Sequence, residues 1–88
     1  MKHTREAAVM EYVGVCVSSL RESAGLSIRD LADKTGIHRN TVAKIEDGEQ
    51  NVTISTVAVL ARELGVPPAD LMPNYYMTAN GRRRGKRR

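Results

Sequence analysis

Apolar side chains recur at spacings of three and four between residues 6 and 24, the pattern of a helix with one buried face. These positions are Val9, Val13, Cys16, Val17, Leu20 and Ala24. The middle of the stretch is rich in β-branched residues and contains Gly14, which costs about 1 kcal/mol inside a helix, so a strand over 12–17 is the alternative. Gly25 then supplies the left-handed residue that commonly ends a helix. The pattern predicts one long helix over residues 6–24.

Each of the next three segments begins with an apolar residue followed by a residue that can cap a helix. The pairs are Leu26-Ser27, Ile37-His38 and Val52-Thr53, and the residues five positions after the first of each pair are Leu31, Val42 and Val57. This is the spacing of a hydrophobic staple. Ser27 and Thr53 are good caps and Asp30 stands at the capping-box position, whereas His38 is a weaker cap. Glycines end each segment, so we expect helices over 28–35, 39–46 and 54–64.

Prolines frame one more element near the end of this pattern. Pro67-Pro68 suits a first helical turn and Pro73 stops the chain from continuing, which predicts a short fifth helix through Met72. We therefore expect an all-α, five-helix bundle in one domain over residues 1–73. Residues 74–88 are expected to be a linker and a basic, disordered tail. The linker contains two adjacent tyrosines, and the alternatives for this segment are a small strand and part of a dimer contact.

The second and third predicted helices are joined by a very short turn, residues 35–38. Gly36 occupies the position that must adopt a left-handed conformation, and Ala32 is small enough for two helices to cross closely. Leu31, Val42 and Ile45 provide the apolar side of the pair. Together these features predict a helix-turn-helix unit.

The stretch from Leu26 to Gly48, continued by residues 60–71, resembles the DNA-binding domain of the phage lambda Cro and repressor, or XRE, family. The resemblance covers about residues 16–72. It implies a lambda-repressor-like bundle of five helices that acts as a homodimer on an inverted-repeat operator. Controller proteins of restriction-modification systems share this fold and size. The resemblance also implies that Arg21 and Glu46 form a structural ion pair.

The helix predicted over 39–46 turns Val42 and Ile45 inward, which leaves its polar side chains on the outer, N-terminal face. The expected base-reading residues are His38, Arg39, Asn40, Ala43 and Lys44. Arginine and lysine donate to guanine O6 and N7, asparagine pairs with adenine, and alanine contacts the thymine methyl group. The resemblance assigns base reading to Arg39, Asn40 and Lys44 in particular. The alternative is a polar helix face that only meets water.

DNA phosphates are expected at helix starts, where unpaired N–H groups carry partial positive charge. The expected phosphate-binding residues are Ser27, Arg29, Thr41, Gln50, Asn51 and Thr53. Members of the family that this chain resembles commonly have a phosphate-binding glutamine where this chain has Ile28. Arg29 or Thr41 is expected to compensate for the missing phosphate contact. Ser27 and Thr53 have the alternative of acting only as helix caps.

Charge is distributed unevenly along the 88 residues, whose formal net charge is +4. Six of the fourteen lysines and arginines are Arg82, Arg83, Arg84, Lys86, Arg87 and Arg88. We expect this tail to bind DNA phosphates or enter a minor groove, adding up to about six neutralised phosphates to the salt dependence. Binding to RNA or to an acidic protein, or a purely solubilising role, remains an alternative.

Other classes of function find little support in the sequence. Cys16, the only cysteine, forms no internal disulfide, and no His/Cys cluster has zinc spacing, so we expect no metal and no cofactor. No catalytic motif is present, and no apolar run is long enough for a membrane span. We expect Cys16, Met10 and Met72 to lie in the core. A non-enzymatic, cytoplasmic, nucleoid-associated protein is predicted.

The resulting hypothesis is a sequence-specific transcriptional regulator of phage or bacterial origin, a repressor that binds a palindromic operator as a homodimer. The alternative is an antitoxin or other protein-interaction module that neutralises a partner protein and also controls its own operon. The acidic body, residues 1–81, keeps this alternative open.

Overall fold

The computed structural model describes residues 5–73, and they form helices without any strand in that range. The elements are α1 (Arg5–Ser23), α2 (Ile28–Thr35), α3 (Arg39–Glu46), α4 (Ile54–Leu64) and the 3₁₀ helix η1 (Pro68–Leu71). The all-α prediction is confirmed, and α1 is displaced by one residue from its predicted bounds. The strand considered for residues 12–17 is wrong, because the whole stretch is helical. The predicted linker and basic tail lie outside the described residues.

The three predicted helix starts are confirmed at the expected residues. Ser27, His38 and Thr53 each have an extended backbone and a side chain that accepts a hydrogen bond from a backbone N–H group in the first turn. Gly36 and Gly65 end α2 and α4 in left-handed conformations, with φ of 76° at both. These local bonds explain why short helices begin and end so sharply in this sequence.

The segment predicted as a short fifth helix through Met72 is a 3₁₀ helix that ends at Leu71, and not an α-helix. Its backbone bonds run from the Asp70 N–H to the Pro67 carbonyl and from the Met72 N–H to the Ala69 carbonyl, both spanning three residues. Met72, predicted to be helical, has an extended backbone with φ −107° and ψ 148°. Prolines on both sides leave too few residues for an α-helical ladder, which needs bonds spanning four.

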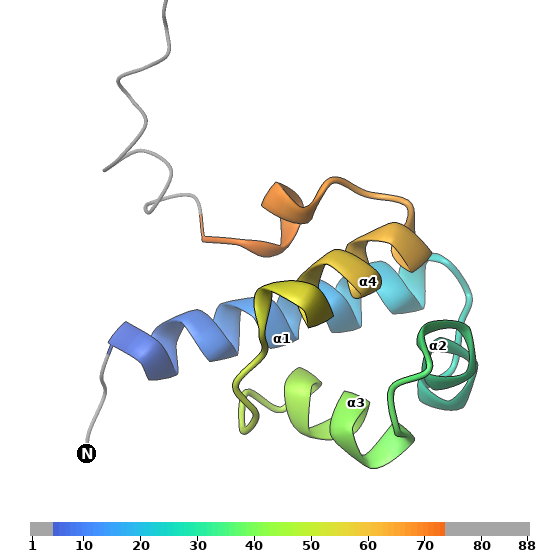
Figure 1. Ribbon diagram of the computed structural model, residues 1–88, viewed down its shortest axis with the longest axis horizontal. Helices are drawn as coiled ribbons and strands as arrows, with labels where there is room; N and C mark the ends of the chain where they lie inside the picture. The colour runs from blue at the N-terminus through green and yellow to red at the C-terminus, as the bar shows by residue number, and fades with distance from the viewer. Residues whose placement is uncertain (1–4, 74–88) are drawn as a thin grey trace, which may run out of the picture.

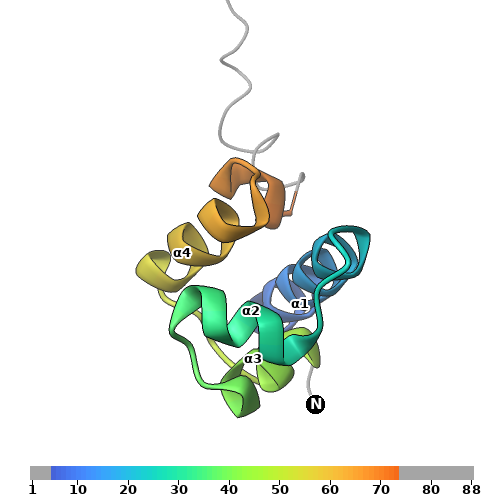
Figure 2. The same ribbon diagram turned by 90° about the vertical axis from the view of Figure 1, so that its right-hand side faces the viewer.

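Every described element contributes to one core. α3 packs against α1, α2 packs against α3 and α4, and α4 and η1 also contact α1 (Figures 1 and 2). The buried apolar residues are Val13, Val17, Leu31, Ala32, Val42, Ile45, Leu60, Ala61 and Leu71. Because all five elements supply core residues, the position of α3 depends on the whole bundle and not on the turn alone.

Gly14 has a packing role that its helix propensity conceals. It is buried in α1, and a Cβ placed there would collide with the carbonyl oxygen of Ile45 and approach that of Glu46 to 2.7 Å. The glycine thus allows α1 to contact the backbone at the C-terminal end of α3. The cost of a glycine inside a helix was one reason to consider a strand here. The close approach of the two helices explains why a glycine occupies this position.

Candidate nucleic-acid interface

The turn between α2 and α3 is fixed by Thr35 and Gly36. The Thr35 hydroxyl donates to the Leu31 carbonyl at 2.8 Å and accepts from the Ile37 N–H at 3.2 Å. The Gly36 N–H donates to the Ala32 carbonyl at 2.9 Å. These bonds set the direction in which the chain enters α3. Thr35 was not among the predicted site residues, although a hydroxyl residue immediately before a C-capping glycine is a signal for such a bond.

The two faces of α3 differ sharply in burial. Val42 is 0% exposed and Ile45 is 1% exposed, so both anchor the inner face. The predicted base-reading residues lie away from this inner face. Four of them are exposed, namely His38, Arg39, Asn40 and Lys44, and Ala43 is half-buried. All five belong to α3 or its cap, so the fold brings them together on one helix.

His38 caps α3 with one ring nitrogen and has a second ring nitrogen that can donate a hydrogen bond. Its Nδ1 atom accepts from the Asn40 N–H at 3.0 Å. Because Nδ1 is the acceptor, a neutral ring carries its proton on Nε2, which points away from the capping bond. An exposed N–H donor therefore stands at the start of α3, and the two residues that follow it, Arg39 and Asn40, are also exposed.

A polar hollow of about 540 Å³ lies where α2 and α3 meet. It is lined by Arg29, Ala32, Asp33, Gly36, Ile37, His38 and Arg39. The hollow thus joins a predicted phosphate-binding residue, Arg29, to two predicted base-reading residues. Asp33, which was not among the predicted site residues, adds an acidic group to the same wall.

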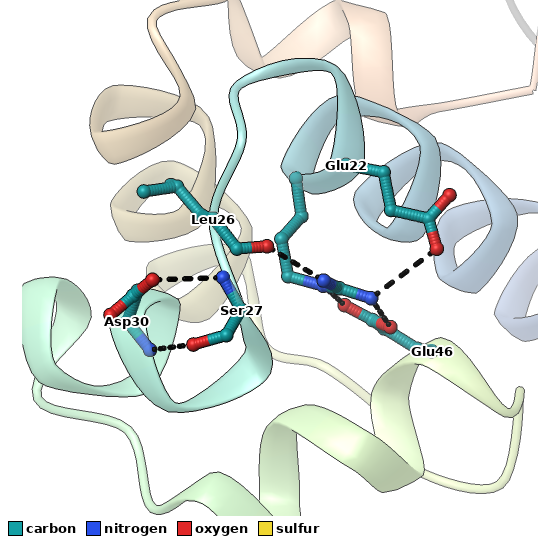
Figure 3. A network of polar contacts seen from close by, with 6 residues as sticks. Glu22, Leu26, Ser27, Asp30 and Glu46 are labelled. Carbon is teal, nitrogen blue, oxygen red and sulfur yellow. Dashed lines mark hydrogen bonds and ion pairs between the residues drawn. The ribbon is translucent and has the colours of Figure 1, made fainter.

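The C-terminal end of α3 is held by an ion pair. Arg21, on α1, donates from Nε to Glu46 Oε2 at 2.7 Å and from Nη2 to Glu46 Oε1 at 3.1 Å (Figure 3). Its Nη1 atom also donates to the Leu26 carbonyl at 2.7 Å. The side chains are only 12% and 8% exposed, and the bonds to Glu46 raise the pKa of the Arg21 guanidinium. The pair implied by the family resemblance therefore connects three segments.

The start of α2 carries an acidic group of its own. The Ser27 hydroxyl accepts from the Asp30 N–H, and the Asp30 carboxylate accepts from the Ser27 N–H, each at 2.9 Å (Figure 3). The bond from the Ser27 backbone lowers the pKa of Asp30, so the group is a carboxylate at neutral pH. A negative charge at this helix start opposes a phosphate there, while exposed Arg29 in the same turn attracts one.

The start of α4 has no such acidic group in its first turn. The Thr53 hydroxyl accepts from the Thr56 N–H at 3.1 Å and is exposed, as is Asn51, whereas Gln50 is half-buried. Of the helix starts predicted to bind phosphate, α4 therefore offers the more favourable electrostatic environment. Thr41, the remaining candidate, is half-buried on α3.

Ile28 has a structural explanation. It is half-buried and packs against the apolar core from the first turn of α2. Its side chain thus makes a contact within the bundle, whereas its neighbour Arg29 is exposed.

Other candidate sites receive little support from the described part of the chain. Residues 5–73 contain no group of three or more His, Cys, Asp or Glu side chains that could hold a metal ion. Burial raises the pKa of the half-buried Cys16 thiol, which disfavours a reactive thiolate. No described helix is long and apolar enough to cross a membrane. His3 and the tail cations Arg82, Arg83, Arg84, Lys86, Arg87 and Arg88 lie outside the described residues.

Comparison with known proteins agrees with this geometry. The sequence model of the helix-turn-helix family HTH_3 matches residues 17–71. Control protein C.SmaI of Serratia marcescens is 34% identical over 64 residues, which are 73% of this chain and 76% of that protein.

Solved structures give the same result. The restriction-modification controller protein C.AhdI from Aeromonas hydrophila has a TM-score of 0.69 and 32% identity, over 72% of this chain and 96% of that one. The BldD DNA-binding domain of S. venezulae has a TM-score of 0.67 and 28% identity, over 75% of this chain and 99% of that one. With a family model, a sequence relative and solved structures in agreement, the chain belongs to the helix-turn-helix family HTH_3, a family of DNA-binding transcriptional regulators.

Proposed function

We propose that this protein reads a specific DNA sequence with the start of α3. The observation that carries the proposal is the outer face of that helix, where His38, Arg39, Asn40 and Lys44 are exposed while Val42 and Ile45 hold the opposite face in the core. Donors in this arrangement match the acceptors of the major groove, with Arg39 and Lys44 suited to guanine. Asn40 is suited to adenine.

Phosphate contacts would flank the reading helix. Arg29 and Thr41 would bind phosphate on the side of the α2–α3 turn. At the start of α4, phosphate would be bound by Gln50, Asn51 and Thr53. Because Asp30 neutralises the start of α2, we assign Ser27 a weaker contact through its hydroxyl. The basic tail over 82–88 would add phosphate contacts that are independent of sequence.

The protein would act as a homodimer on an inverted repeat, with two reading helices about 34 Å apart. The similarity to C.SmaI, a control protein, and to C.AhdI, a restriction-modification controller protein, favours genes of a restriction-modification system as its targets. We propose repression as the outcome. This likeness supports gene control over the alternative, neutralisation of a toxin. The same likeness supports a role without enzymatic activity.

The test is selection of bound sequences from a random DNA pool with the full chain, followed by affinity measurements on the selected duplex. Arg39→Ala should weaken specific binding by about 1–3 kcal/mol and relax the choice of base at one position of each half-site. Arg62→Ala is the matched control, because it also removes an exposed positive charge, but from α4 instead of α3; the Arg62 side chain is 73% exposed. Equal losses on specific and random DNA in Arg39→Ala would contradict base reading.

A further inference from the structure

Asp33 is the acidic residue of the polar hollow between α2 and α3, and the proposed function gives it no role. It shares the lining of the hollow with the cations Arg29 and Arg39. Arg29 stands four residues before Asp33 on α2, so the two occupy one face of that helix. Arg39 is the first residue of α3. The carboxylate thus shares one space with a predicted phosphate-binding residue and a predicted base-reading residue.

The Asp33 carboxylate has no bonding partner in the described part of the bundle. Within residues 5–73, its side chain forms neither an ion pair nor a hydrogen bond, and the same is true of Arg29 and Arg39. All three residues are exposed. No polar contact within residues 5–73 therefore accounts for an acidic residue at this position, and the carboxylate is free to bind a cation beside it.

The hollow is open at the turn that joins the two helices. Ala32 and Gly36 are the small residues of its lining, and a Cβ placed on Gly36 would meet no atom within 4 Å beyond its chain neighbours. α2 and α3 pack against each other on either side of this turn (Figure 2). The long side chain of Arg39 can thus extend from the start of α3 toward α2 without displacing another group.

We propose that Asp33 is the positioning residue for Arg39 in base reading. A guanidinium carries five N–H donors in a planar fork, so one edge can bind a carboxylate while another donates to guanine O6 and N7. Asp33 binds the first edge once DNA lies against α3, where the exclusion of water strengthens the pair. The second edge is then directed toward the base and away from phosphates. The inference rests on the proposed function, because it requires that Arg39 reads a base.

Arg39 is a better partner for Asp33 than Arg29 is. A pair between Arg29 and Asp33 would place the cation four residues before the acid on one helix, which is the less favourable order for such pairs. It would also occupy the guanidinium that is proposed to bind phosphate. The pair with Arg39 has neither disadvantage, since it joins two helices and leaves an edge of the guanidinium free for guanine.

The experiment measures the affinity of the full chain for the selected duplex and for duplexes in which one base pair of a half-site is changed. Arg39→Ala identifies the position that Arg39 reads, as the one whose preference it relaxes. Asp33→Asn should reduce the preference at that position about fivefold, the upper contribution of an exposed ion pair. Asp33→Glu, which keeps the carboxylate, should retain more of the preference. In the Arg39→Ala background, Asp33→Asn should reduce the preference no further, because it acts through Arg39.

Binding to random DNA separates positioning from a loss of structure. Asp33→Asn should bind random DNA at least as tightly as the wild type, because it removes a negative charge that repels phosphates. Asp70→Asn is the matched control, since it removes the same charge from an exposed residue of η1 that does not line the hollow. It should leave the preference unchanged.

The proposal is overturned by an unchanged preference or weaker binding of random DNA in Asp33→Asn. An equal loss of preference in Asp70→Asn, or a loss that persists in the Arg39→Ala background, overturns it as well. If Arg39→Ala relaxes no position, the proposed function fails and this inference fails with it. If Arg39→Ala relaxes one position and Asp33→Asn does not, only this inference fails.

Discussion

The ion pair between Arg21 and Glu46 should be the main polar determinant of stability in the described part of this bundle. Arg21→Met keeps the length of the side chain and removes three hydrogen bonds, two to Glu46 and one to the Leu26 carbonyl. The Glu46 carboxylate, in a side chain only 8% exposed, then loses its counter-ion. Breaking a buried pair in this way costs about 3–5 kcal/mol.

The lower end of that range applies here. Arg21 is 12% exposed, so water can partly solvate the carboxylate that the substitution leaves behind. A loss of about 3 kcal/mol is large against the roughly 5 kcal/mol expected at the lower end for small domains. With a urea dependence of about 1 kcal/mol per molar, the midpoint of unfolding should fall by about 3 M.

Urea unfolding followed by circular dichroism provides the assay. Arg21→Met combined with Glu46→Leu should recover much of the loss, because a buried pair can often be replaced by apolar side chains without cost. Arg62→Met, which breaks the exposed pair with Glu63, is the control and should cost less than about 1 kcal/mol. The reasoning is refuted if Arg21→Met falls within that same limit or if the double variant is no more stable than the single one.

Three further predictions concern the helix contacts and the tail. Gly14→Ala should destabilise the fold by about 1–2 kcal/mol in urea, because overpacking against α3 outweighs the gain in helix propensity, and exposed Ser19→Ala is the control that should not. Asp30→Ala should lose stability relative to the wild type at neutral pH, and this difference should vanish as pH falls below about 4, because a lowered pKa stabilises the fold only while the group is ionised. A difference that persists in acid would contradict the capping box. Deleting residues 82–88 should reduce the salt dependence of DNA binding by up to about six phosphates, and an unchanged slope would exclude the tail from the DNA.

The helix starts could be predicted because capping is local. Ser27 and Asp30, three residues apart, satisfy each other's bonds whatever the rest of the chain does. The same is true of Thr53 and of the left-handed glycines. The short turn at η1 was harder, since prolines signal where a helix begins and ends without specifying which backbone bonds form between them.

The surfaces could not be predicted in the same way. Gly14 is adjacent in space to Ile45, about thirty residues away in the sequence, and no local pattern records that contact. A hollow of about 490 Å³ with an apolar lining is likewise assembled from α1, α4 and η1. Met10 and Met72, which line it, were expected in the core but are only half-buried. A helical pattern shows which side is apolar but not whether another element covers it.

The orientation of α3 depends on contacts at both of its ends. Thr35 and Gly36 fix the entry to α3, while Arg21 and the backbone contact at Gly14 fix its exit. The two contacts at the exit both come from α1. In the proposed mode of DNA reading, α1 therefore holds the outer face of α3 toward the duplex, although Arg21 and Gly14 lie outside the helix-turn-helix unit.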